Sequence, residues 1–248
     1  MTDATTAVSL PLFYKEPVAI NAETHRELTV SPSPAGYAFA TRAHTVMLNA
    51  AEFIEAGHEY PIIFSSGADG SAGPLALLGL EAGENLYVDN AGVWNANYIP
   101  AYVRRYPFIP ADTGAPEFPV CVDWAFDGLN NEGGQRIFDE AGEPTEYCRF
   151  IQAFVSDFQR QHALGRAFSA KLRELELFRS MDANIKLIDG RAFVLQEFLI
   201  VDENKLARLG DVAVLELFRK GYLALIYAHL ASLRNLAKLS QLKGATTA

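Results

Sequence analysis

Apolar residues in the first part of the chain recur at alternate positions in short runs, which is the pattern of half-buried β-strands. Gly, Pro, Asn and Asp lie between these runs and mark turns. No helical crossover of about a dozen residues separates the runs, so we expect the strands to pair antiparallel. Strands are predicted at residues 25–30, 37–41, 60–65, 74–80, 85–89 and 120–124.

Two short helices are predicted among these strands. Asn49 is suited to cap the first helix, with the Glu52 side chain returning to the Asn49 backbone N–H, and Gly57 is expected to end it. Pro100 is tolerated in the first turn of a helix. A second helix is therefore expected from Tyr98 to about Arg105, before Pro107.

The period changes to that of helices in the second part of the chain. Apolar residues spaced three and four apart predict helices over 144–162 and 167–178, and a final long helix over 211–242. Asp202 is expected to start a short helix, and Asp189-Gly190 marks a hairpin turn.

These patterns predict an α+β fold. An antiparallel, β-rich half at residues 10–140 is expected to pack on a helical half at residues 141–243 that contains a small β-hairpin, in one compact unit. The 248 residues are 50% hydrophobic, which is enough apolar material for a sizeable core.

Charge and the N-terminus narrow the class of protein. The net charge of −9 argues against broad binding to nucleic acid or to anionic lipid, since both need a basic face. The N-terminus lacks a basic region followed by an apolar stretch, and no apolar run approaches the ~20 residues that span a bilayer. A cytoplasmic location is the resulting expectation.

Candidate catalytic and metal-binding chemistry is sparse. Cys121 and Cys148 stand among apolar neighbours and are expected to be buried free thiols. The histidines lack the spacing of a metal site, and no nucleophile motif or phosphate-binding glycine loop is present. The pair Glu52 and Glu55 is interpreted as a solvated helix face. We therefore predict no catalytic residues, no metal and no cofactor.

Residues 98–108, Tyr-Ile-Pro-Ala-Tyr-Val-Arg-Arg-Tyr-Pro-Phe, combine aromatic and cationic side chains more densely than any other stretch. Arginine pairs with carboxylate or phosphate and stacks on aromatic rings, so this stretch is a candidate surface for a protein or peptide partner. The alternative is that both arginines pair with acids inside the protein. The candidate binding residues are Tyr98, Tyr102, Arg104, Arg105 and Tyr106.

The final predicted helix is a second candidate surface. Its apolar face continues for several turns past Tyr222, and basic residues stand near its ends. Packing on the core explains this pattern, and a homodimer through the C-terminal helix is the alternative.

Several stretches resemble the SapC family of bacterial proteins, and they occur in the family's order along nearly the whole chain. They are Tyr60–Phe64, Ala76–Leu80, Asn85–Val88, Tyr98–Phe108 and Ile226–Leu233. The family is associated with bacterial surface-layer (S-layer) loci, and it offers no catalytic residues to carry over to this chain. The resemblance implies an accessory role beside tryptophan-halogenase-like and TonB-receptor systems.

The leading hypothesis is a non-enzymatic binding or accessory protein that recognises a protein or peptide through the aromatic-arginine stretch. An enzyme of unrecognised type, with a site between the two halves, is one alternative. A structural S-layer component is another.

Overall fold

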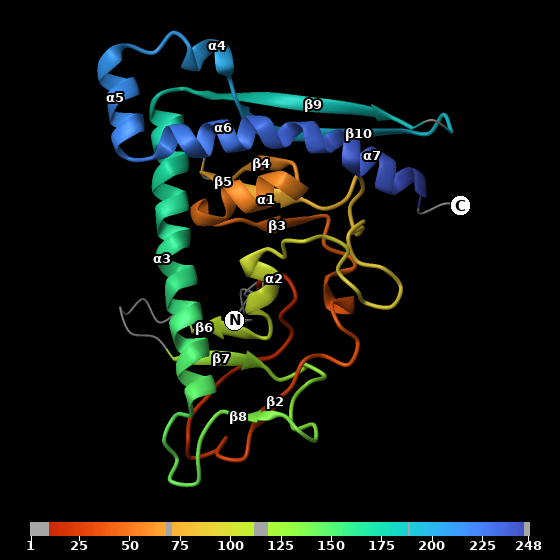
Figure 1. The fold of residues 1–248 in the computed structure, drawn as a ribbon, viewed down its shortest axis with the longest axis vertical. Helices are drawn as coiled ribbons and strands as arrows, with labels where there is room; N and C mark the ends of the chain where they lie inside the picture. The colour runs from red at the N-terminus through yellow and green to blue at the C-terminus, as the bar shows by residue number, and fades with distance from the viewer. Residues whose placement is uncertain (1–9, 68–70, 112–118, 188, 246–248) are drawn as a thin grey trace, which may run out of the picture. The chain divides into compact units, whose positions relative to one another are not determined.

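The computed structural model describes residues 10–67, 71–111, 119–187 and 189–245 (Figure 1). The chain divides into two units, each built from two separate stretches. Unit 1 comprises the described residues of Met1–Ala35 and Arg105–Val155, and unit 2 those of Gly36–Arg104 and Ser156–Ala248. Because this division is based on contacts between residues and not on secondary structure, it does not test the predicted β-rich half (10–140) and helical half (141–243), which stay a prediction.

Unit 1 is built around two small antiparallel sheets. The larger has the order β1-β7-β6, from strands β1 (Pro17–Ala19), β7 (Val120–Asp123) and β6 (Phe108–Pro110). The smaller pairs β2 (Thr29–Val30) with β8 (Gln135–Arg136). Apolar side chains from these strands and from the first turns of helix α3 form the core. Its buried members are Leu28, Val30, Phe108, Val122, Phe126, Ile137, Phe138, Cys148, Ile151 and Val155.

Unit 2 contains a five-stranded antiparallel sheet of order β3-β5-β4-β10-β9. Pairing of Leu199 with Phe64 joins the long C-terminal hairpin to β4. The strands are β3 (Thr45–Met47), β4 (Ile62–Ser66), β5 (Ala72–Leu77), β9 (Phe178–Lys186) and β10 (Ala192–Val201).

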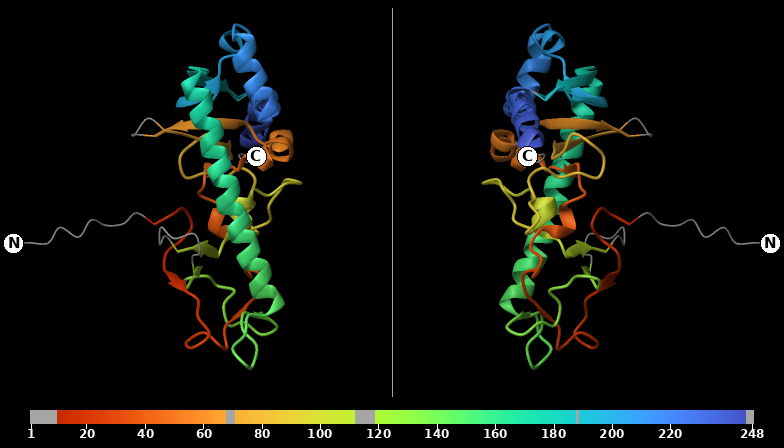
Figure 2. Two further views of the ribbon diagram at one scale, coloured as in Figure 1. Left: turned by 90° about the vertical axis from the view of Figure 1, so that its left-hand side faces the viewer. Right: turned by 90° about the vertical axis from the view of Figure 1, so that its right-hand side faces the viewer.

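Helix α3 is the one long helix in the described residues, and Figure 2 shows it unbroken in both views. The remaining helices are short. Their bounds are η1 (Ala38–Ala40), η2 (Ala50–Glu52), α1 (Phe53–Glu59), α2 (Ala101–Arg105), α3 (Glu146–Glu174), α4 (Glu203–Leu206), α5 (Asp211–Arg219), α6 (Tyr222–Ser232), η3 (Leu233–Asn235) and α7 (Leu236–Ala245).

Helix α6 is tied to the sheet of unit 2 by a buried histidine. The backbone N–H of Val201 donates to His229 Nε2 at 3.1 Å, and His229 Nδ1 lies 2.8 Å from the carbonyl oxygen of Ile62. Burial lowers the pKa of His229 to about 4, so the ring is neutral at pH 7 and can accept one hydrogen bond while donating the other. His229 therefore links β10 and β4 to the helix.

The α+β class and the antiparallel pairing are confirmed. The predicted strands at 60–65, 74–80 and 120–124 correspond to β4, β5 and β7. Asp202 caps α4 by accepting from the backbone N–H groups of Asn204 and Lys205, and Gly190 turns the hairpin with φ of 92°. No helix in the described part of the chain is long and apolar enough to span a bilayer.

Two predicted strands are wrong. Residues 37–41 contain the 3₁₀ helix η1, in which Ala40 is buried while the aromatic Phe39 is only half-buried, so the aromatic-small alternation did not mark a strand with a buried aromatic face. Residues 85–89 form turns with a single bridge between Val88 and Trp94. Short alternating runs without a pairing partner do not make a strand.

The effect of two glycines on the predicted helices was also wrong: the helix expected to end at Gly57 continues, and the long C-terminal helix is interrupted at Gly221. Helix α1 passes through Gly57, whose hydrogen faces Ala228 and Ser232; a Cβ atom there would lie 3.4 Å from the Ala228 carbonyl oxygen. The stretches 144–162 and 167–178 belong largely to the single helix α3. The predicted helix 211–242 is instead broken at Gly221, which has φ of 72°.

Candidate functional site

The predicted binding stretch is divided between the two units at its adjacent arginines. Tyr98, Tyr102 and Arg104 belong to unit 2, whereas Arg105 and Tyr106 belong to unit 1. Tyr102 and Arg105 are each only 6% exposed, Tyr98 and Tyr106 are half-buried, and Arg104 is exposed. Within unit 2, Tyr98 and Arg104 are therefore more accessible to solvent than Tyr102.

In unit 2 a buried carboxylate holds the start of this stretch. Glu52 is 5% exposed, and its Oε1 accepts from the Tyr98 hydroxyl at 2.8 Å and from the Ala101 backbone N–H at 2.6 Å. Its Oε2 accepts from the Asn49 backbone N–H at 2.9 Å, as expected for the predicted cap. Burial, together with the neighbouring Glu52 charge, raises the pKa of Tyr98, so the hydroxyl stays protonated and donates.

Arg104 lies over the ring that Glu52 fixes. Its Nε donates to the Ile99 carbonyl oxygen at 2.9 Å, and its Cζ lies 5.7 Å from the centroid of the Tyr98 ring. That distance is in the range of a cation–π contact. The exposed guanidinium is thus oriented by its own backbone and by an aromatic ring that is itself anchored.

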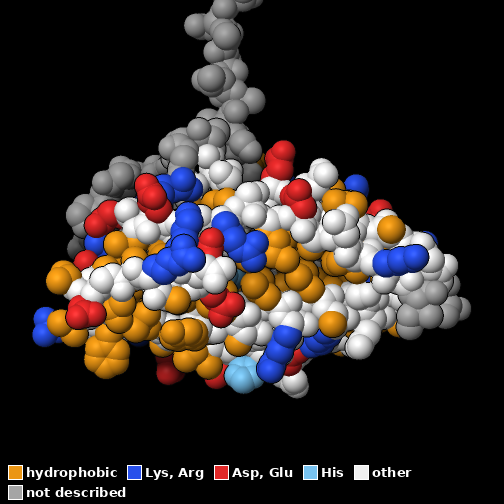
Figure 3. All heavy atoms as spheres, turned by 90° about the horizontal axis from the view of Figure 1, so that it is seen from above, with side chains coloured by type: hydrophobic (Ala, Val, Ile, Leu, Met, Phe, Trp, Pro, Cys, Tyr) orange, Lys and Arg blue, Asp and Glu red, His pale blue; other side chains and the backbone are white. Residues whose placement is uncertain are grey.

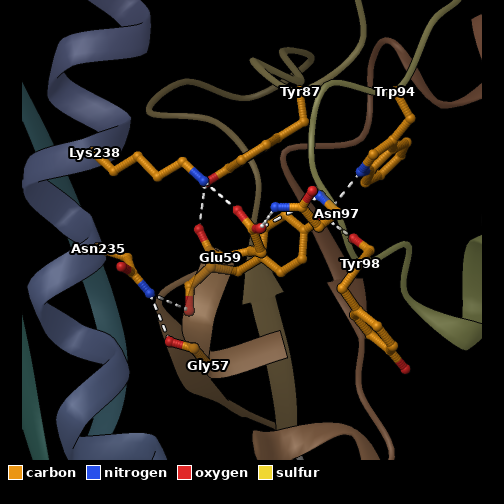
Figure 4. Close-up of polar contacts among 9 residues, drawn as sticks. Gly57, Glu59, Tyr87, Trp94, Asn97, Tyr98, Asn235 and Lys238 are labelled. Atoms are coloured by element: carbon orange, nitrogen blue, oxygen red, sulfur yellow. Dashed lines mark hydrogen bonds and ion pairs between the residues drawn. The ribbon is translucent and has the colours of Figure 1, made fainter. Parts of the chain in front are cut away.

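A second carboxylate of the same helical segment anchors the residue before Tyr98 (Figure 4). Glu59 is 8% exposed, and its Oε1 accepts from the Asn97 side-chain amide at 2.7 Å and from the Asn97 backbone N–H at 3.3 Å. Its Oε2 forms an ion pair with Lys238 of α7, whose Nζ lies 5.4 Å from the centroid of the Tyr87 ring. Burial alone raises the pKa of Glu59, but hydrogen bonds from Lys238 and Asn97 outweigh it and leave the pKa below its usual value.

Glu52 and Glu59 are seven residues apart, so on the continuous η2–α1 segment they lie on one side. Tyr60, which follows α1, is fully buried; its hydroxyl donates to the Tyr98 carbonyl oxygen and accepts from Trp94 Nε1 at 2.9 Å. Figure 4 shows Asn97 between Glu59 and Tyr98. The backbone of the segment that leads into Arg104 is therefore held by hydrogen bonds to three side chains of unit 2, those of Glu52, Glu59 and Tyr60.

In unit 1 the rest of the stretch surrounds another buried carboxylate. Asp123 is fully buried and accepts from the backbone N–H of Lys15 at 3.2 Å, from that of Glu16 at 2.7 Å and from the Tyr106 hydroxyl at 3.0 Å. The Tyr106 ring lies edge-on to the Tyr14 ring, with centroids 5.4 Å apart. This cluster fastens the N-terminal segment to β7.

Arg105 is part of the interior of unit 1. Its Nε donates to the Tyr14 hydroxyl at 3.3 Å, and its Cζ lies 5.6 Å from the centroid of the Tyr14 ring. The Tyr14 hydroxyl in turn donates to the Phe108 carbonyl oxygen at 2.6 Å. The two adjacent arginines therefore face different surroundings, since Arg104 is exposed and Arg105 is buried beside the Tyr14 ring.

In the part of the chain that the structure describes, the two thiols are buried and the side chains of metal-ligating type do not cluster. Among the described residues, no group of three or more His, Cys, Asp and Glu side chains could hold a metal ion. Cys121 and Cys148 are buried and free, as predicted, and burial raises the pKa of both thiols. Such thiols are poor nucleophiles at neutral pH.

Sequence reasoning missed the carboxylates that support the stretch. The interpretation of the pair Glu52 and Glu55 as a solvated helix face is wrong for Glu52, because Glu55 is exposed and Glu52 is buried. The capping position of Glu52 was a usable indication of a structural role. Glu59 and Lys238 are 179 residues apart, and Asp123 and Glu16 are 107 apart, so nothing local marks either contact.

Comparisons with known proteins bear on the family. A search of curated proteins and a search of solved structures each gave no match. The family model described as SapC matches residues 20–239, nearly the whole chain. The chain belongs to the SapC family.

Proposed function

We propose that this chain is a non-enzymatic binding or accessory protein that recognises a carboxylate of a protein or peptide partner through Tyr98 and Arg104. One observation carries the proposal: the exposed Arg104 guanidinium is held over the Tyr98 ring, and Glu52 fixes that ring. The carboxylate is either a C-terminus or an acidic side chain, the groups that a guanidinium fork pairs with best.

Preorganisation is the physical reason for this choice. Ordering a long side chain on binding costs about 0.5–1.5 kcal/mol, and part of that cost is already met where the side chain is held in place. The supports from Glu52, Glu59 and Tyr60 restrain the backbone of the segment as well. A binding surface built this way loses less entropy than a mobile arginine would.

The other predicted residues take supporting roles in this proposal. Tyr102 packs beside Phe158, with ring centroids 6.2 Å apart, and Arg105 packs against Tyr14. Neither needs to contact the partner. Tryptophan-halogenase-like proteins and components of surface-layer or TonB-linked systems, which the family resemblance suggests, are the first partners to test.

The test compares synthetic peptides that differ only at the C-terminus. A library of peptides of about ten residues is prepared twice, once with a free carboxylate and once with an amide, and binding is measured by fluorescence anisotropy. The wild type should bind a subset of the free acids, and Arg104→Ala should weaken that binding about 10- to 100-fold, the range for a hydrogen-bonded charge pair. Acidic side chains within the peptides provide the second source of carboxylate.

Arg166→Ala is the matched control, because Arg166 is also an exposed arginine of unit 2. It should bind peptides as the wild type does, and both variants should keep the wild-type melting temperature. Equal binding by Arg104→Ala and Arg166→Ala, or the absence of any carboxylate-dependent binding, contradicts the proposal.

A further inference from the structure

Helix α5 carries an apolar face that unit 2 leaves exposed. Val212 is 85% exposed, Leu215 46% and Phe218 69%, whereas Leu217 on the opposite side is fully buried. At about 100° per residue, Val212 and Phe218 both lie within about 60° of Leu215 around the helix. Figure 3 shows apolar side chains gathered at the left of this view, the side on which Figure 1 draws α5.

Two opposite charges lie on the same face. Asp211 begins the helix and Arg219 ends it, and both are exposed. Each is about 40° from Leu215 around the helix, so both border the apolar residues. Within the described ranges of the chain, neither side chain has an ion-pair partner. Lys220, by contrast, pairs with Glu216.

The order of these residues is symmetric about Leu215. Asp211 precedes it by four positions and Arg219 follows it by four, while Val212 and Phe218 stand three positions before and after it. When two identical helices pack antiparallel about a two-fold axis, a residue before the centre of one lies opposite the equally distant residue after the centre of the other. Asp211 would then meet Arg219 of the second copy, Val212 would meet Phe218, and the two Leu215 side chains would meet each other.

We propose that α5 is an isologous contact surface whose occupant is α5 of a second copy of this chain, packed antiparallel. The two ion pairs, the apolar contacts and the antiparallel helix dipoles all favour this one arrangement. An anionic membrane fits less well, because Asp211 lies on the same face and the chain carries a net charge of −9.

The contact is small. Nine residues of helix span only about 13 Å, so the pair buries less than the ~1,200 Å² of a standard stable interface. We therefore expect a reversible dimer with a dissociation constant in the micromolar range rather than a permanent one. Two chains of charge −9 repel each other at low ionic strength, so the measurement needs about 0.15 M salt.

Sedimentation velocity of the full chain, from about 1 to about 500 µM, tests this arrangement. Asp211→Arg alone and Arg219→Asp alone each place like charges opposite one another, and each should weaken the dimer at least about 10-fold. Mixing the two variants restores both ion pairs, so the mixture should dimerise again. The double variant carrying both changes should also dimerise with itself.

Leu215→Asp should remove the dimer altogether, and Glu203→Ala, outside this face, should not affect it. A wild type that stays monomeric at all these concentrations overturns the proposal. So does a dimer that survives Leu215→Asp, or one for which mixing the two charge variants restores nothing. Vesicles of phosphatidylserine serve as a last comparison, since binding to them by a monomeric wild type would assign the face to lipid.

Discussion

The two parts of the aromatic-arginine stretch are built on the same plan in different units. In unit 2, Glu52 accepts from two backbone N–H groups and from the Tyr98 hydroxyl. In unit 1, Asp123 accepts from the backbone N–H groups of Lys15 and Glu16 and from the Tyr106 hydroxyl. Each buried carboxylate is thus stabilised by amide and phenol donors, which is how a buried charge is kept at low cost.

The two parts differ in what happens to the neighbouring arginine. Arg105 is enclosed against Tyr14, whereas Arg104 stays exposed over Tyr98. A buried carboxylate with amide and phenol donors therefore occurs in two settings. In unit 1 it lies beside a buried arginine, and in unit 2 it supports an arginine that remains accessible. Adjacent identical residues need not share a role, and burial rather than residue type separates them.

Removing the fully buried carboxylate should have the largest effect. Asp123→Ala leaves the N–H groups of Lys15 and Glu16 and the Tyr106 hydroxyl without their acceptor, and we expect a loss of about 3 kcal/mol or more in the free energy of unfolding. Urea denaturation measures it. Asp127→Ala, at an exposed aspartate of the same unit, should change stability by no more than about 0.5 kcal/mol. Equal losses would mean that Asp123 is not the anchor of unit 1.

The adjacent arginines offer the next largest contrast. Arg105→Ala removes a buried hydrogen bond and a cation–π contact with Tyr14, and should cost about 2–3 kcal/mol of unfolding free energy. Arg104→Ala should cost about 0.5 kcal/mol or less, because the side chain is exposed. Urea denaturation of the two variants in parallel measures both losses in the free energy of unfolding. Should both lose the same stability, Arg104 is structural and its proposed role in binding fails.

Substitution of Tyr98 and of Tyr106 tests whether the hydroxyl-to-carboxylate hydrogen bond stabilises both units. Tyr98→Phe and Tyr106→Phe each remove one hydroxyl that donates to a buried carboxylate, at 2.8 and 3.0 Å. Hydrogen bonds to charged groups contribute about 1.5–3 kcal/mol, and we expect each variant to lose about 1.5 kcal/mol by thermal unfolding. Pairing Tyr98→Phe with Glu52→Gln should cost less than the sum of the two single changes. Additive losses of stability would mean that the Tyr98 hydroxyl and the Glu52 carboxylate do not interact energetically.

Local patterns in the sequence predicted the parts of the fold that local physics decides. The hairpin at Asp189-Gly190, the cap at Asp202 and the antiparallel class all follow from residues that lie close together in the chain. Glycines were harder to interpret. Gly57 lies inside helix α1, with α6 packed beside it, whereas Gly221 does break a helix.

The candidate site shows where local reasoning ends. The stretch was identified by its composition, yet the exposure of Arg104 and the burial of Arg105 depend on which residues surround each side chain. Tyr14, which encloses Arg105, is 91 residues away in the chain. A pattern within residues 98–108 cannot contain that information.

Glu59 sharpens the comparison, because its support includes a cation rather than amides alone. Its pKa lies below the ordinary value of 4.5, since hydrogen bonds from Lys238 and Asn97 outweigh the effect of burial. A carboxyl with a lowered pKa contributes stability that is present above pH 4.5 and is lost as the pH falls through its folded-state value. Lys238→Met, which keeps most of the apolar stem, should therefore reduce the free energy of unfolding by about 1 kcal/mol or less at pH 7.

That difference between Lys238→Met and the wild type should shrink toward zero as the pH is lowered to about 3, because protonated Glu59 no longer attracts the ammonium group. Urea denaturation at a series of pH values measures the trend. Lys186→Met, at an exposed lysine of β9, is the control and should show no pH-dependent difference. A Lys238→Met difference that is the same at pH 3 and pH 7 would mean that Lys238 acts by packing on Tyr87. Glu59 would then join Glu52 and Asp123 as a carboxylate held by neutral donors.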